Sequence, residues 1–517
     1  MRKKLKGLLR IIFGRTTFAV LALAVQIGVL AWCFLFFMEN IVYIFGLYIL
    51  LSAGVVLYIL NKRESPEYKT AWIIPVLILP VFGALLYLFV EMQLPTRWMA
   101  GRVKYLSAET RPYLTQDEET ERAYGDDDSA GGSLSRYMNS WGGYPVYQNT
   151  SVTYFPLGDD QFPELKCQLE GARHFIFLEY FIVEHGVLWD SILEILERKA
   201  KEGVEVRFMY DGMGCLTLLP HHYPKEMEEK GIRCKIFSPV RPVLSTYQNN
   251  RDHRKIVVID GHTAFTGGTN LADEYINRKM RFGHWKDTAV MLKGDGVKSF
   301  TMMFLQNWNI TEMKRENYEA YLESYEDFCP VPAPKAGYVM PYGDSPLDEE
   351  SVGKQVYVDI LYQARRYVHM MTPYLILDQD MMSALTYAAK RGVETIIIMP
   401  HIPDKIYAYL LARSYYEELL LAGVKIYEYT PGFVHAKSYV SDDDRAVVGT
   451  INMDYRSLYL HFECAVYFYR NPAVEDVERD FQETLEKCQE ITLEDCRNYP
   501  RIKKLAGSLL RLFAPLM

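Results

Sequence analysis

Two segments far apart in the chain carry the same four polar residue types at the same spacing. Each has a histidine, a lysine, an aspartate and an asparagine, which are His253, Lys255, Asp260 and Asn270 in the first segment and His435, Lys437, Asp442 and Asn452 in the second. Both follow the pattern H-x-K-x4-D-x6-G-x2-N without a gap, on apolar segments typical of β-strands. Two complete copies predict a functional unit that is present twice.

The residue types in this pattern suit an anionic target rich in oxygen atoms. Histidine and lysine two residues apart share one face of a strand, and lysine binds phosphate as a point charge. If the two copies face one another, one histidine can attack phosphorus while the other protonates the leaving oxygen. Because no cysteine or carboxylate cluster stands beside the histidines in the sequence, we expect neither a metal site nor a cofactor.

Both motifs resemble the paired H-x-K-x4-D signatures of the phospholipase D superfamily, and the surrounding sequence resembles bacterial cardiolipin synthases. Residues 285–288 and 448–457 add to a similarity that covers nearly the whole chain. One departure is His461, where the family more often has asparagine, although Glu463 is kept. The resemblance implies transfer of a phosphatidyl group from one phosphatidylglycerol to the hydroxyl of another, giving cardiolipin and glycerol.

The resemblance also implies roles for the motif residues. His253 is expected to be the nucleophile that forms a phosphohistidine-type intermediate, and His435 the acid and then the base. The lysines and asparagines of the motifs are expected to hold the non-bridging phosphate oxygens, and they are Lys255, Lys437, Asn270 and Asn452.

Four carboxylates are further candidates for the site. A nucleophilic histidine needs a carboxylate on its far nitrogen, and Glu463 and Asp287 are the candidates by position. Asp260 and Asp442 belong to the motifs and are counted with the catalytic set. Their odd spacing from the lysines places them on the opposite strand face, so a structural role remains equally open.

The N-terminal part is predicted to lie in a membrane. A basic segment, residues 1–15, precedes three apolar runs at 16–38, 41–60 and 71–90, each close to the roughly 20 residues that cross a bilayer. They predict transmembrane helices of a multi-pass protein in the bacterial plasma membrane. Pro75, Pro80 and Gly83 interrupt the third run. A full crossing, which puts the catalytic domains outside the cytoplasm, is slightly favoured over a re-entrant segment.

An internal duplication organises the rest of the chain. After a linker at 91–144, residues 145–335 and 336–500 each show strand, helix, strand and the motif in the same order, with a Pro-rich segment at 330–334 near their junction. Expected helices at 188–201 and 380–391 correspond, as do expected strands at 204–210 and 393–399. The fold class is therefore α/β, with two similar phospholipase D-type domains. The tail, 501–517, is basic and amphipathic, and it can either bind a lipid surface or pack on the domain itself.

Composition restricts the alternatives. The 57 basic residues are outnumbered by 65 acidic ones, which argues against a nucleic-acid partner held by a basic surface. The eight cysteines form no C-x2-C pair, so neither a zinc site nor a disulfide framework is expected. A phospholipase D hydrolase and a transphosphatidylase with another alcohol remain open, and a membrane-anchored nuclease is disfavoured. The sequence does not identify the donor and acceptor lipids or the oligomeric state.

Overall fold

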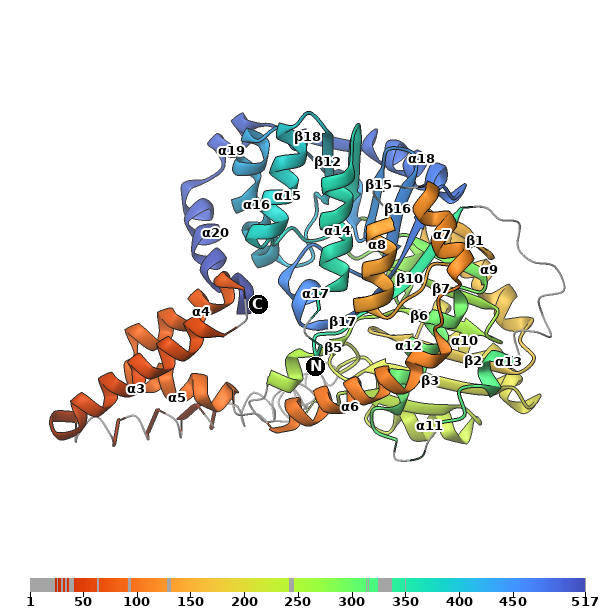
Figure 1. Ribbon diagram of the computed structural model, residues 1–517, viewed down its shortest axis with the longest axis horizontal. Helices are drawn as coiled ribbons and strands as arrows, with labels where there is room; N and C mark the ends of the chain where they lie inside the picture. The colour runs from red at the N-terminus through yellow and green to blue at the C-terminus, as the bar shows by residue number, and fades with distance from the viewer. Residues whose placement is uncertain are drawn as a thin grey trace, which may run out of the picture.

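The computed structural model shows two α/β domains with a group of helices projecting from one side (Figure 1). It describes residues 24–25, 27–28, 31–32, 35–36, 41–62, 65–91, 94–127, 132–240, 246–312, 314, 316–323, 337–348 and 350–516. The predicted basic N-terminus, most of the first apolar run and the Pro-rich junction lie outside these residues.

The first domain is built on a seven-stranded sheet in the order β1-β9-β7-β6-β2-β3-β4. Its strands are β1 (Thr150–Phe155), β2 (Phe175–Tyr180), β3 (Glu205–Asp211), β4 (Arg233–Phe237), β6 (Ile256–Ile259), β7 (Thr263–Gly267) and β9 (Ala289–Gly294). The larger helices are α9 (Gly158–Glu170), α10 (Val187–Lys201), α11 (Tyr223–Glu229) and α12 (Val297–Asn309). Strands β2, β3 and β4 are parallel, and helices connect them as in other βαβ units.

The second domain repeats this plan and adds one edge strand, in the order β10-β17-β16-β15-β11-β12-β13-β18. Its strands are β10 (Tyr338–Asp344), β11 (Tyr367–Met371), β12 (Glu394–Pro400), β13 (Lys425–Tyr429), β15 (Ser438–Ser441), β16 (Arg445–Gly449), β17 (His461–Tyr469) and β18 (Cys488–Ile491). The main helices are α14 (Val352–Gln363), α15 (Gln379–Lys390), α16 (Ile406–Leu421), α17 (Tyr455–Tyr459) and α18 (Ala473–Leu485). The two similar α/β domains predicted from the duplication are confirmed.

The two domains share a hydrophobic cluster. Val258 and Val290 of the first domain pack in it with Val448 and Phe462 of the second. Helix α12 is almost entirely buried within this cluster. Because apolar burial contributes about 25 cal/mol per Å², a shared core resists separation of the domains. It therefore holds the two motifs in a fixed relation.

The apolar N-terminal region folds as a helix followed by a helical hairpin. Helix α3 (Ile41–Asn61) packs against α4 (Pro66–Ile78) and α5 (Pro80–Glu91). The chain reverses at Leu79, where a Cβ on Gly83 would lie 2.4 Å from the Pro75 carbonyl oxygen. Lys62 and Glu91 then form an ion pair of 2.8 Å.

The favoured expectation of a single crossing by the third apolar run is therefore wrong. Two short helices fold back on each other, and the run begins and ends near the same point. Proline at the first position of α5 suits a new helix, whereas within a continuous helix it would remove a hydrogen bond. Within the described part of the chain, no helix has the combination of length and hydropathy required for a membrane span.

Shorter elements complete the chain at both ends. The predicted linker contains α6 (Leu94–Thr110), α7 (Glu118–Asp127) and α8 (Gly132–Tyr137). At the C-terminus, α19 (Leu493–Asn498) is followed by α20 (Arg501–Phe513), which packs beside α16.

Candidate active site

Short strands that cross between the domains position both histidines. Strand β5 (Arg251–Asp252) pairs in parallel with the start of β17, and the His253 N–H donates to the Phe462 carbonyl at 2.9 Å. In the other half, β14 (Gly432–Val434) pairs in parallel with β8 (His284–Lys286), and the His435 N–H donates to the Lys286 carbonyl at 2.7 Å. Each motif thus begins where the chain has just reached the other domain.

The register of these pairs puts a carboxylate opposite each histidine. Nδ1 of His253 lies 2.9 and 3.0 Å from the two carboxylate oxygens of Glu463. Nδ1 of His435 lies 2.6 Å from Oδ2 of Asp287. All four side chains are buried. Both carboxylates that were candidates by position are brought to a histidine, and each serves the histidine of the other domain.

These contacts fix which ring nitrogen faces a substrate. A carboxylate accepts hydrogen bonds only, so it selects the tautomer with the proton on Nδ1. Nε2 is then the nitrogen with a lone pair for phosphorus or for a proton. Nζ of Lys437 also lies 2.9 Å from His435 Nδ1. Since the ring N–H can serve one acceptor, the closer anionic Asp287 determines its orientation.

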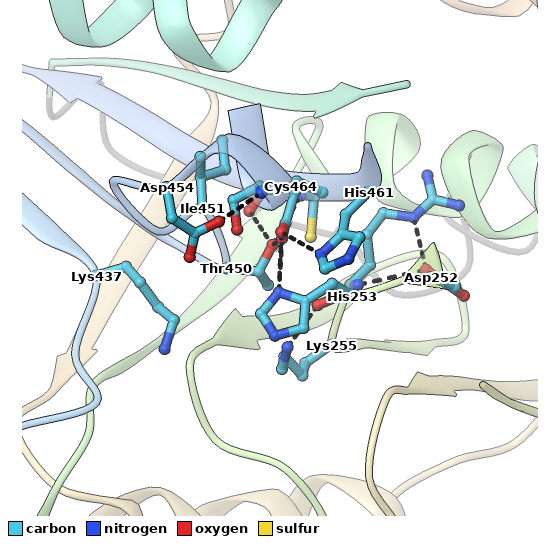
Figure 2. Close-up of polar contacts among 12 residues, drawn as sticks. Asp252, His253, Lys255, Lys437, Thr450, Ile451, Asp454, His461 and Cys464 are labelled. Carbon is cyan, nitrogen blue, oxygen red and sulfur yellow. Dashed lines mark hydrogen bonds and ion pairs between the residues drawn. The ribbon is translucent and has the colours of Figure 1, made fainter. Parts of the chain in front are cut away.

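The two motif lysines are buried where the half-sites meet. Figure 2 shows Lys437 extending toward Lys255 and His253. Nζ of each lysine donates to the carbonyl oxygen of the histidine two residues before it. Burial lowers the pKa of Lys255 to about 8 and that of Lys437 to about 7. Repulsion from Lys255 is a further cause of the low pKa of Lys437, after burial, so an anion between the two lysines is favoured.

Both histidines are held neutral in the absence of an anion. Burial lowers the pKa of His253 well below its usual range, although Glu463 opposes this shift. Burial, followed by the charge of Lys437, lowers the pKa of His435 to about 4, and Asp287 opposes it. Burial alone would raise the pKa of Glu463, but the neighbouring His253 and their hydrogen bond lower it on balance. Neutral His253 is the form that can attack phosphorus.

The motif aspartates make backbone contacts away from the two histidines. Asp260 (φ 51°) follows β6, and its carboxylate accepts the N–H groups of residues 173–175 at 2.7–2.8 Å. Asp442 (φ 56°) follows β15 and accepts those of residues 365–367 at 2.7–3.0 Å. Aspartate tolerates this left-handed conformation better than most residues. Of the two roles open from the sequence, these contacts favour the structural one, and a catalytic role for either aspartate stays a prediction.

The two motif asparagines differ in their surroundings. Oδ1 of Asn270 accepts from the Ile182 N–H at 3.0 Å, and its Nδ2 donates to the Tyr275 hydroxyl at 2.8 Å. Asn452 is equally buried, but its Oδ1 has no hydrogen-bond partner. A buried amide oxygen without a partner is costly. A phosphate oxygen needs an N–H donor, and Nδ2 of Asn270 is already engaged by Tyr275, so Asn452 is the better placed of the two to bind phosphate, while Asn270 holds a loop.

The motif glycines allow the carboxylate-bearing segments to approach. A Cβ on Gly267 (φ 152°) would lie 2.3 Å from the Thr288 carbonyl oxygen, next to Asp287. A Cβ on Gly449 would lie 2.5 Å from the Cys464 carbonyl oxygen, next to Glu463. Any larger residue would push the carboxylate away from its histidine.

Several neighbours of the histidines were not identified as site residues from the sequence. Aromatic rings surround His435, with Tyr275, Trp285 and Phe433 at centroid distances of 5.4–5.8 Å. Phe181 and His461 lie beside His253 at 5.0 and 5.6 Å. These residues follow no spacing rule relative to the motifs. Two of them carried a signal: His461 as a departure from the family pattern, and Trp285 as part of the family-like segment 285–288.

His461 also changes the argument about metals. The expectation of no metal site rested on the absence of a carboxylate cluster beside the histidines in the sequence. The fold supplies such a group, because ligand atoms of His253, His461 and Glu463 lie within 4.8 Å of one another. Glu463 is already engaged by His253 and by the Thr450 hydroxyl. The argument from sequence spacing therefore does not hold for this half-site.

Comparisons with known proteins agree with this geometry. A family model described as "Cardiolipin synthase, PLD-like domain" matches residues 165–290 and 357–485, and one described as "Phospholipase_D-nuclease N-terminal" matches 47–91. A Streptococcus mutans protein without an assigned function is 50% identical over 464 residues, which is 90% of this chain and 100% of that one. Cardiolipin synthase 2 of Bacillus anthracis is 34% identical over 465 residues, covering 90% of this chain and 89% of that protein.

Among solved structures, Haemophilus influenzae phosphatidylserine synthase has a TM-score of 0.53 at 13% identity and covers 72% of this chain and 94% of that one. Identity this low supports the fold alone. The sequence relatives extend over nine-tenths of the chain, including both motif-bearing domains. The chain therefore belongs to the family of bacterial cardiolipin synthases with phospholipase D-like domains.

Proposed function

We propose that this protein is a membrane cardiolipin synthase that uses two phosphatidylglycerol molecules. The observation that carries the proposal is the crossed pair of His–carboxylate contacts, His253 with Glu463 and His435 with Asp287. It aligns two neutral imidazoles at one anion site lined by buried lysines. This arrangement suits a double displacement at phosphorus, in which one histidine attacks and the other moves protons.

In the first step, Nε2 of His253 attacks the phosphorus of one phosphatidylglycerol. A nitrogen–phosphorus bond forms, the bond from phosphorus to the glycerol headgroup oxygen breaks, and protonated His435 gives that oxygen a proton. Glycerol leaves, and a phosphatidyl group remains on His253. Lys255 and Lys437 stabilise the charge on the non-bridging oxygens of the transition state.

In the second step, a hydroxyl of another phosphatidylglycerol attacks the same phosphorus. His435 accepts its proton, the nitrogen–phosphorus bond breaks, and cardiolipin is released. The donor phosphodiester supplies the charge that makes this cycle possible. Without a bound anion, burial and the charge of Lys437 keep the pKa of His435 low. The negative charge of the bound phosphodiester offsets the effect of Lys437, so the pKa of His435 rises.

The membrane region would deliver both lipids to this site. Its apolar runs, the family match at 47–91 and exposed apolar side chains such as Leu77 and Ile78 support a multi-pass anchor in the bacterial plasma membrane. Holding both substrates in the bilayer raises the local concentration of the lipid hydroxyl relative to water. Membrane attachment therefore favours transfer over hydrolysis.

We further propose that the catalytic domains lie in the cytoplasm. The Lys62–Glu91 ion pair brings together the ends of α3 and α5, so the chain would enter and leave the membrane through α4 and α5 on one side. The sequence predicts crossings by the apolar runs 16–38 and 41–60, although no described helix meets the requirements of a span, and two crossings would place the basic residues 1–15 on that side too. The positive-inside rule assigns it to the cytoplasm.

Topology can be tested on the native exposed Cys167. An impermeant thiol reagent should label its peptide only after the membrane is opened. Labelling in intact cells would place the catalytic domains outside and overturn the cytoplasmic assignment.

The reaction can be tested with purified enzyme in phosphatidylglycerol bilayers. We expect cardiolipin and glycerol in equal amounts, with phosphatidic acid as a minor product. Predominant phosphatidic acid at high phosphatidylglycerol density would assign a hydrolase instead. A requirement for an added alcohol would assign a transphosphatidylase with a different acceptor.

A further inference from the structure

The C-terminal helix α20 turns its apolar side away from the protein. Five apolar side chains are about half exposed or more, and they are Ile502 (83%), Leu505 (62%), Leu509 (53%), Leu512 (49%) and Phe513 (50%). Their separations of three and four residues place them on one face of the helix. A surface helix ordinarily buries such a face against its domain, so this orientation is the reverse of the usual one.

Specific contacts hold the helix in this orientation. A Cβ on Gly507 would lie 2.6 Å from the Leu410 carbonyl oxygen, so the glycine allows α20 to lie directly against α16. The guanidinium of Arg511 stacks 4.3 Å from the Tyr415 ring centroid and lies 3.3 Å from the Glu418 carboxylate. The partly buried Leu510 packs against the domain core. Rolling the helix to bury its apolar stripe would lose all of these contacts.

The stripe lies next to the proposed membrane region. The short helix after α20, η5 (Ala514–Leu516), contacts α4. The N-terminal end of α4 meets the second domain where Glu67 accepts the Gln379 N–H at 3.1 Å. Figure 1 shows α20 on the side of the domain from which α3, α4 and α5 project.

The charges of the helix are all of one sign. Arg501, Lys503, Lys504 and Arg511 are its charged residues, and it contains no acidic residue. Basic residues at the border of an apolar stripe are typical of helices that lie in the headgroup region of anionic bilayers. A second copy of this chain would have to supply both an apolar groove for the stripe and acidic residues for the basic border, whereas the surface of an anionic bilayer offers both together.

We propose that α20 is an in-plane membrane helix that inserts its apolar stripe into the surface of an anionic phospholipid bilayer. Together with α4, to which it is joined through η5, it gives the second domain two adjacent attachments to the bilayer. Two attachments restrict rotation of the catalytic domains, which one flexible tether would leave free. This role concerns orientation on the membrane and does not depend on which alcohol the enzyme uses.

The test uses the full-length protein in nanodiscs that contain phosphatidylglycerol. A photoreactive benzoylphenylalanine is placed at Leu509, or at Tyr387 of α15 as a control of matched exposure, 53% and 55%. We expect phospholipid adducts at position 509 at least about tenfold above those at position 387, because an inserted stripe contacts acyl chains. The readout is a covalent lipid adduct and not turnover, so its failure is distinguishable from failure of the proposed reaction.

Three results would overturn the proposal. Cross-links from position 509 to a peptide of a second copy would assign the stripe to an oligomer interface. Equal adduct yields at positions 509 and 387 would show that the stripe does not enter the lipid. Unchanged yield for Lys503→Glu, compared with the surface control Lys390→Glu, would remove the anionic lipid from the proposal.

Discussion

Around His253 and His435 the backbone is laid out in the same way, whereas the side chains around the two rings differ. Both histidines follow a strand that pairs with the other domain, and both hold a carboxylate from that domain. His435 is surrounded by three aromatic rings and has the Lys437 ammonium beside its ring. His253 has Phe181 and the polar ring of His461 instead.

This difference shows how a duplicated unit can divide one reaction between two identical residue types. The repeated backbone gives each histidine the same tautomer, which double displacement requires of both. Burial and the charge of the neighbouring motif lysine lower the pKa of both rings, and a carboxylate opposes this shift in each half-site. A cation beside His435 makes its protonation sensitive to the arriving phosphate anion. The asymmetry therefore supports the proposed division between nucleophile and acid–base.

The largest effects should come from replacing the histidines themselves. His253→Ala and His435→Ala should each lower kcat on phosphatidylglycerol by at least about 10⁴-fold, because the two groups act as a unit.

A substrate with a p-nitrophenol leaving group should distinguish the roles of the two histidines, since this group leaves without protonation. His435→Ala should give one burst of p-nitrophenol and a trapped adduct on His253, whereas His253→Ala should give none. An adduct on His435 would reverse the roles, and normal folding of both variants by thermal unfolding is the control.

The next largest effects should come from the carboxylates, in a crossed pattern. Glu463→Gln and Asp287→Asn keep the side-chain shape but no longer favour the Nδ1–H tautomer, so kcat should fall by about 10² to 10⁴-fold. On the p-nitrophenol substrate, Glu463→Gln should behave like the His253 variant and Asp287→Asn like the His435 variant. If Glu463→Gln instead behaved like the His435 variant, and Asp287→Asn like the His253 variant, the crossed assignment would be contradicted. The burst amplitude with substrate in excess over enzyme provides the measurement.

A part of the site can be predicted from the sequence only where the pattern that encodes it extends over enough residues. The histidine and lysine pairs could be predicted because an ungapped motif occurs twice. Glu463 and Asp287 were candidates by position, but the pairing of each with the histidine of the other domain could not be predicted, because it depends on β5, β8 and β14, strands of two or three residues with no periodicity. The main helices and strands of the duplication were predicted to within a few residues, as α10 and α15 show.

The same limit applies at the N-terminus. Pro75, Pro80 and Gly83 were visible as interruptions, but whether the run bends or reverses depends on the close approach of Gly83 to Pro75. That contact joins residues eight positions apart through tertiary packing, which local propensity does not determine. The catalytic roles of His253 and His435 remain predictions.

A smaller effect is expected from pH. Because burial lowers the pKa of Lys437 to about 7 and of Lys255 to about 8, both are charged below these values and lose their charge as the pH rises through them. The kcat/KM for phosphatidylglycerol should therefore fall above about pH 7 to 8, as phosphate binding weakens. Lys437→Arg should move this alkaline limb to higher pH, at some loss of activity. An unchanged limb would mean that the lysines are not the groups that titrate.

The smallest effect, and the most informative about the difference between the half-sites, is expected from His461→Asn. The His461 ring nitrogens have no hydrogen-bond partner, and Nδ1 lies 3.7 Å from the Glu463 carboxylate that also holds His253. At neutral pH, asparagine can serve the same carboxylate, so kcat should stay within about threefold of the parent enzyme. The charge of His461 is one of the smaller causes that lower the pKa of His253, after burial. Removing the His461 imidazole should raise the pKa of His253 and move the acid limb of kcat/KM to higher pH.

His461→Gln is the matched control, since it also lacks a titrating group and should shift the limb in the same direction. A loss of more than about 10²-fold at neutral pH in both variants would show that His461 takes part in the chemistry, and the two half-sites would then differ in mechanism and not only in surroundings.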